Sequence, residues 1–133
     1  MRRSIRSTTL LVLLAATSAC GGNSNPIAPR FQPEVINNAD SFSFQVTGVQ
    51  NASSTLNYTW QNTGTVATVN QSASISSGSA TLVILDASGT QVYSRSLTAN
   101  GTFVSTAGTT GLWTIRVVFS GTNGTVNFRS NRA

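Results

Sequence analysis

TLVILDASGTQVY, running from Thr81 to Tyr93, is the stretch that decides the fold of this chain. Residues 81–85 form an unbroken apolar and β-branched run, which is typical of a central strand covered on both faces. Asp86 and Gly89 follow at the first and last positions of a tight turn, as a type I turn prefers. Residues 90–97 return to an extended pattern, so the stretch predicts a β-hairpin.

The same period-two alternation continues on both sides of this hairpin. Apolar residues alternate with polar ones in several runs: Phe42-Phe44-Val46, Leu56-Tyr58-Trp60, Trp113-Ile115-Val117-Phe119 and Val126-Phe128. Asn100-Gly101 is a strong turn signal, and it predicts a second hairpin that joins residues 96–99 to residues 102–105.

Short strands at regular spacing predict an all-β fold, here a single antiparallel β-sandwich with a jelly-roll-like arrangement of about eight strands over residues 39–133. We expect two stacked sheets to bury one set of side chains. That predicted core consists of Phe42, Trp60, Leu82, Ile84, Trp113, Ile115, Val117 and Phe128.

Three segments of the predicted domain resemble the pre-peptidase C-terminal domains of bacteria. They are TLVILDASGTQVY, then GLWTIRV at residues 111–117, then GTVNF at residues 124–128. The resemblance implies a small jelly-roll-like sandwich, and in that family such domains are often accessory or binding modules of secreted enzymes. Family members that bind calcium use acidic loops, which this chain lacks, so no binding residue is carried over.

The first twenty residues have the layout of an export signal. A basic segment (Met1–Arg6) and an apolar segment (Leu10–Ala16) are followed by small residues that end at Cys20. Residues 8–19 are also too short for a membrane-spanning helix, which needs about 17–25 residues.

This layout resembles the precursor signal of bacterial lipoproteins. The resemblance implies that residues 1–19 are a signal peptide and that Cys20 is acylated and anchors the chain in a membrane. Gly21, rather than aspartate, follows the cysteine. This resembles the pattern of lipoproteins that are sorted to the outer membrane or the cell surface. Thr17 stands where leucine is usual, so cleavage after Ala19 and secretion of a soluble protein is the alternative.

Residues 20–38 contain three prolines and a glycine pair, and they predict a flexible tether. Phe31, Val35 and Ile36 are candidates to dock on the edge of the domain as a first short strand.

The composition excludes several classes of function. Histidine is absent and Cys20 is the sole cysteine, which excludes Ser-His-Asp catalysis and zinc sites built from His and Cys. Three of the eight arginines lie in the signal, and the remaining five are scattered, whereas a nucleic-acid interface needs a clustered basic footprint. Glu34, Asp40 and Asp86 are the only acidic residues. We therefore expect no enzyme, no cofactor, no metal site and no nucleic-acid partner.

Aromatic side chains are the remaining candidates for ligand contact. Alternation directs Trp60 and Trp113 into the core, which leaves Tyr93 as the best exposed candidate and Tyr58 as the second. The sequence thus predicts a lipid-anchored, non-catalytic domain of the cell envelope that binds a protein or glycan partner or has a structural role. A secreted carbohydrate-binding or accessory module is the alternative.

Overall fold

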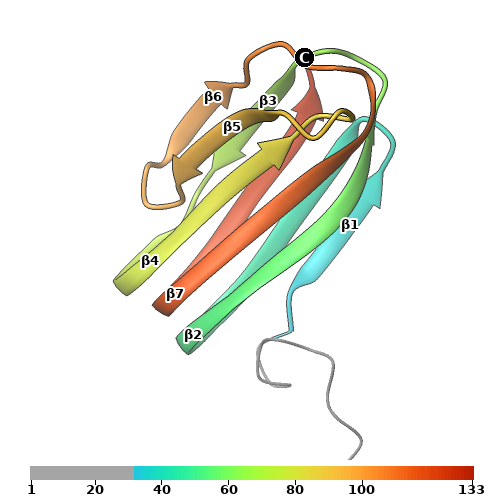
Figure 1. Ribbon diagram of the computed structural model, residues 1–133. Helices are drawn as coiled ribbons and strands as arrows, with labels where there is room; N and C mark the ends of the chain where they lie inside the picture. Colours follow the sequence, from blue (N-terminus) through green and yellow to red (C-terminus); the bar gives the residue numbers. More distant parts are fainter. Residues whose placement is uncertain (1–31) are drawn as a thin grey trace, which may run out of the picture.

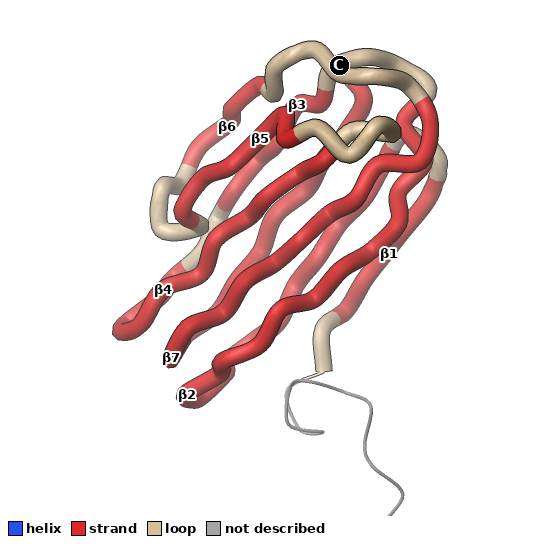
Figure 2. The backbone as a smooth tube through the Cα atoms, in the orientation of Figure 1, coloured by secondary structure: helices blue, strands red, loops and turns tan. Residues whose placement is uncertain are grey.

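The computed structural model describes residues 32–133, and this part of the chain is built from strands and loops without a helix (Figures 1 and 2). Antiparallel pairing links seven strands. Their bounds are β1 Glu34–Asn38, β2 Ser41–Asn62, β3 Ala67–Gln71, β4 Ser74–Leu85, β5 Gln91–Ser96, β6 Gly101–Val104 and β7 Gly111–Arg132. In the described range, accordingly, no helix is long and apolar enough to cross a membrane.

Strands β2 and β7 are each 22 residues long and pair with each other in antiparallel fashion along their whole length. Strand β2 folds back on itself, since the amide of Asp40, just before β2, donates to the carbonyl of Gln61 near the end of β2 at 2.8 Å. Strand β7 follows the same bend because it pairs with β2 along its length. The pairing register shifts between Val46 and Ser54, where β2 bends alongside β7. Each of the two strands therefore supplies one arm to each of two layers (Figure 1).

The pairings define the order of strands in the two layers. The β1 layer runs β1, β2 (41–46), β7 (126–131), β3, β6. The β5 layer runs β2 (54–62), β7 (111–119), β4, β5. When the arms of β2 and β7 are taken separately, this is the strand order of a jelly roll with β1 added at one edge. The predicted all-β, jelly-roll-like sandwich is confirmed.

Glycines allow the strands to bend where the layers join. Gly78 has φ +74°, and a Cβ atom there would lie 2.0 Å from the carbonyl oxygen of Gly121. Gly124 has φ +140°, and its Cβ would lie 2.1 Å from the carbonyl oxygen of Ser74. Strands β4 and β7 thus approach too closely at Gly78 and Gly124 for a side chain at either position.

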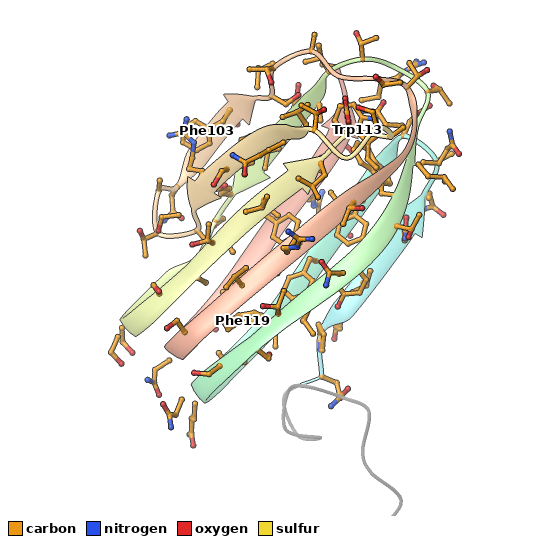
Figure 3. All side chains as sticks on the ribbon, in the orientation of Figure 1. Phe103, Trp113 and Phe119 are labelled. Atoms are coloured by element: carbon orange, nitrogen blue, oxygen red, sulfur yellow. The ribbon has the colours of Figure 1, made fainter. Side chains whose placement is uncertain are left out.

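The space between the layers holds the core. Every side chain of the predicted core set is fully buried. The Trp60 and Trp113 rings meet edge to face at 5.9 Å between centroids, and their indole N–H groups donate to the carbonyls of Asn38 and Thr109. Trp113 and Phe119 belong to the same arm of β7 and lie toward opposite ends of the interior (Figure 3). The prediction that both tryptophans fill the core is confirmed.

The hairpin predicted at Asn100-Gly101 is wrong. Strand β5 pairs with β4 and strand β6 pairs with β3, so residues 97–100 cross from one layer to the other. Leu97 is fully buried and its amide donates to the carbonyl of Ala80, while the side chain of Asn100 bonds to both backbone groups of Ala73. These contacts hold the segment that crosses between the layers. The turn falls on residues 97–98 rather than on Asn100-Gly101, and Gly101 is already the first residue of β6.

The central strand in TLVIL is covered on one face only, contrary to the sequence prediction. Leu82 and Ile84 are buried, whereas Val83 and Leu85 are partly exposed on the outer face of the β5 layer. A two-layer sandwich has no third layer to cover that face, so the run follows the ordinary alternation.

The sheet begins earlier than the sequence indicates. Residues 34–38, assigned to the tether, form β1 and pair in register with residues 41–45 of β2. Val35 packs against the core, as proposed for a first short strand, whereas Ile36 points outward. The signal peptide, Cys20 and Phe31 lie outside the described residues.

Candidate functional site

A groove of about 380 Å³ lies on the outer face of the β1 layer. It crosses β1, the first arm of β2 and the last arm of β7. The lining residues are Glu34, Val35, Ile36, Ser43, Phe44, Gln45, Asn127 and Arg129. We refer to it below as the β1 groove.

Strand register explains why a hollow forms at this place. One row of paired residues across the three strands is Glu34, Gln45 and Asn127, and the next row is Ile36, Ser43 and Arg129. Side chains in such rows project from the same face of the sheet. Ser43 has the shortest side chain of the six and occupies the middle strand, so it forms the floor between longer neighbours.

Two charged groups of the β1 groove have no partner within residues 32–133. The Glu34 carboxylate and the Arg129 guanidinium make no hydrogen bond or ion pair with another described residue, including each other. Both side chains are exposed. The groove therefore presents one free acceptor group and one free donor group of opposite charge.

The other ionisable groups of the described range are engaged elsewhere. Arg95 stacks on the Phe103 ring at 3.8 Å, and the Arg116 Nε donates to Asn57 Oδ1 at 2.9 Å. Arg132 lies 3.9 Å from Asp40. Arg95 and Arg116 do not share a face, because Arg95 pairs with the inward-facing Leu82 whereas Arg116 pairs with Val83.

Polar side chains line the groove between these two charges. Asn127 Nδ2 and Gln45 Oε1 lie 3.5 Å apart, at the outer limit of a hydrogen bond, so both amides can turn toward a ligand. Ile36 is 62% exposed beside them and adds an apolar surface. The arrangement suits a ligand that needs hydrogen-bond donors and acceptors together with a small apolar contact.

Tyr93, predicted as the best exposed aromatic residue, is buried with 6% of its surface exposed. It pairs with Ile84 and therefore faces the core. Its hydroxyl donates to Gln71 Oε1 at 2.6 Å, while Gln71 Nε2 donates to the carbonyls of Ser96 and Ala99. Burial raises the pKa of Tyr93. The exposure predicted for Tyr93 is wrong, and the residue ties β5 to β3 across the two layers.

Tyr58 does not line the β1 groove either. Its ring is half-buried and packs between the layers, 5.5 Å from the Phe42 ring and 6.0 Å from the Phe44 ring. Burial raises the pKa of its hydroxyl. The structure places both predicted tyrosines in packing contacts and brings neither of them to the groove.

Asp86 organises the loops at the opposite end of the sandwich from the bends. Its Oδ1 accepts hydrogen bonds from the amides of Ser88 and Thr90 and from the Ser88 hydroxyl, and its Oδ2 accepts one from the amide of Thr109. The Gly89 amide closes the turn on the Asp86 carbonyl at 3.0 Å. The interpretation of Asp86 as a turn residue is confirmed, and its contacts also join two loops.

The hydrogen bonds to Asp86, first among them the one from the Thr109 amide, lower the pKa of its carboxyl group from 3.8 to about 2. A carboxylate whose pKa is lower in the folded state stabilises the fold above its unfolded pKa, and this stabilisation is lost as the pH falls through the folded value. We therefore expect the unfolding midpoint in urea to fall between pH 3.8 and about 2.

The Asp86→Asn variant tests this expectation, because its amide does not titrate. Asp86→Asn should unfold at lower urea near neutral pH and should lose much of the acid dependence. The part that remains belongs to Asp40, whose pKa is lowered mainly by the Thr63 amide. An unchanged acid profile in Asp86→Asn would contradict the assignment.

Asp40 and Asp86 serve separate loops. Asp40 has φ +64° in the turn between β1 and β2, and its carboxylate accepts hydrogen bonds from the amide and the hydroxyl of Thr63 at 2.8 Å each. Arg132 binds the same pair through its Nη1, which donates to Thr63 Oγ1. Both carboxylates are thus occupied by structural hydrogen bonds rather than directed together at a common site.

The sequence reasoning missed Glu34 and Arg129 as site residues. Alternation around the buried Phe128 does place Asn127 and Arg129 on an outer face, so this half of the site was accessible from the sequence. Glu34 stood in the predicted tether, and nothing in the sequence indicates that β1 pairs beside the arm of β2 that contacts residues 127–129.

Comparison with known proteins gives no relative from which a site can be transferred. No protein-family model matches this chain, and a search of curated proteins finds no match either. The β1 groove is therefore assigned from its geometry and chemistry.

Proposed function

We propose that this chain is a lipid-anchored, non-catalytic domain of the cell envelope that binds a partner in the β1 groove. The observation that carries the proposal is the groove itself, which gathers the free carboxylate and the free guanidinium of residues 32–133. Binding sites commonly combine a concave surface with a few polar groups that orient the ligand.

The anchor is supported by the sequence. Cys20 is the sole cysteine and stands directly after the small residues that end the export signal. Fourteen positions separate Cys20 from Glu34, so a fully extended connection spans at most about 50 Å. An acylated Cys20 would therefore keep the β1 groove within that distance of the membrane surface.

The absence of catalysis is supported by the chemistry of the groove. Hydrolysis by carboxyl groups, as in glycosidases, uses two carboxyl groups that flank the reacting bond. Glu34 is the single carboxyl group that lines the groove, and Ser43 has no histidine to activate it because the chain contains none. This set of residues suits recognition of a ligand rather than its conversion.

The Cys20→Ala variant of the full precursor tests the anchor. Acyl chains contribute about 0.8 kcal/mol of membrane affinity per buried methylene, so their loss should release the protein. We expect the unsubstituted protein in the membrane fraction and Cys20→Ala in the soluble fraction. Mass spectrometry of the N-terminal peptide should show acyl chains on Cys20, and globomycin should cause the precursor to accumulate.

Membrane association that persists in Cys20→Ala would overturn the lipid anchor. A secreted carbohydrate-binding or accessory module is the second candidate, favoured by Thr17 in place of the usual leucine. An unmodified N-terminus in the culture medium would support that candidate. Ser18→Ala is a matched control, since alanine is also small and should leave processing unchanged.

A further inference from the structure

We infer that the β1 groove binds a short zwitterionic peptide chain, with its ammonium group at Glu34 and its carboxylate at Arg129. The inference rests on the proposed function, in which this groove is the binding site, and it names the class of ligand. It depends on the charges, their spacing and the polar floor between them.

Charge complementarity requires a ligand that carries both signs. The Glu34 carboxylate attracts an ammonium group, while the Arg129 guanidinium is suited to bidentate binding of a carboxylate. A neutral sugar would leave both charges without a counter-ion, and a purely acidic ligand would meet repulsion from Glu34. A zwitterion satisfies Glu34 and Arg129 together.

Strand geometry sets the distance between the two charges on such a ligand. Neighbouring strands lie about 4.8 Å apart, so β1 and β7, which flank β2, lie about 10 Å apart. Glu34 and Arg129 also stand one row apart along the strands, which adds a step of about 7 Å at right angles to the first. Their Cα atoms are therefore roughly 12 Å apart, which an extended chain covers in about four residues.

The groove between the charges fits the backbone of a peptide. The Gln45 and Asn127 amides each offer a donor and an acceptor, as peptide groups require, and the Ser43 hydroxyl does the same from the floor. Ile36 offers an exposed apolar surface to a small side chain such as a methyl group. Tetra-alanine with free ends combines these features and is the probe we select.

The experiment titrates the full mature protein in detergent with tetra-alanine and follows binding by NMR. The same titration uses N-acetylated tetra-alanine, C-amidated tetra-alanine and chitotetraose. Exposed charge pairs contribute modestly, so we expect blocking either end to weaken binding about two- to five-fold. Chitotetraose should bind more weakly than the free peptide.

Three variants assign the two ends of the peptide. In Glu34→Gln, acetylation should no longer weaken binding while amidation still does. In Arg129→Gln the pattern should be reversed. Ser43→Tyr should fill the floor and abolish binding of every probe, whereas Thr55→Tyr, at an exposed position on the outer face of the β5 layer, should bind like the unsubstituted protein.

The possible results separate this inference from the proposed function. If chitotetraose binds at least as tightly as the peptide and Ser43→Tyr abolishes chitotetraose binding, the inference of a zwitterionic peptide ligand is wrong, but the groove remains a binding site. If acetylation and amidation have no effect, the assignment of the two ends is overturned. If no probe binds, the peptide inference fails, while the lipid anchor is still decided by the fractionation of Cys20→Ala.

Discussion

Gly124→Ala is expected to destabilise the domain by about 3–5 kcal/mol, because it combines a backbone clash with an unfavourable φ. The new Cβ would stand 2.1 Å from the Ser74 carbonyl oxygen and 2.9 Å from the Ile75 Cα, and both are backbone atoms that cannot turn aside. Relief requires β4 and β7 to separate where the two layers join. This loss is a large share of the 5–15 kcal/mol that typically stabilises a domain.

Gly48→Ala provides the matched control for this experiment. Gly48 also has a positive φ, +59°, and also lies at a bend, but a Cβ there would meet no atom within 4 Å. Alanine at this position should therefore cost about 1 kcal/mol from backbone strain alone. Urea unfolding followed by tryptophan fluorescence measures both variants. Equal losses in Gly48→Ala and Gly124→Ala would show that close packing of the bends is unimportant.

Trp113→Ala should destabilise the domain by a comparable amount, about 3–5 kcal/mol. Trp113 is fully buried, so truncation leaves a large cavity beside Trp60. It also removes the indole N–H that donates to the Thr109 carbonyl at 2.7 Å. That carbonyl belongs to the loop whose Thr109 amide holds Asp86, so the loop should loosen as well.

Two further substitutions separate packing from hydrogen bonding at this position. Trp113→Phe keeps an aromatic ring but cannot donate to Thr109, and it should lose less stability than Trp113→Ala. Leu112→Ala is the control, since Leu112 is adjacent in sequence but 60% exposed, and it should change stability by no more than about 0.5 kcal/mol. A loss below about 1 kcal/mol in Trp113→Ala would contradict the role of this ring in the core.

The success and the failure of the sequence predictions have one physical origin. Alternation reports which side of a strand a residue occupies, and burial of Trp60, Trp113 and the other predicted core residues follows from it. Alternation does not report which strand lies alongside. The Asn100-Gly101 pair was therefore assigned to the wrong hairpin, and the turn itself lies earlier, at residues 97–98, with Gly101 already in β6.

Tyr93 shows a different limit of local patterns. Val92 and Tyr93 are consecutive and both buried, because the pairing of β5 with β4 is irregular next to Ile84. A strict period of two allows only one of these neighbours inside. The irregularity depends on the partner strand, so the sequence of β5 alone could not show that Tyr93 faces the core.

The sequence by itself determined the fold class, most of the core and the residue types that limit chemistry, because strand periodicity and composition are local properties. The absence of histidine and the single cysteine at position 20 need no structure to restrict the possible reactions. Tertiary structure alone decided that β2 and β7 bend into both layers and that β1 pairs beside them. Glu34 and Arg129 lie 95 positions apart in the chain, and only this strand order brings their side chains to one groove.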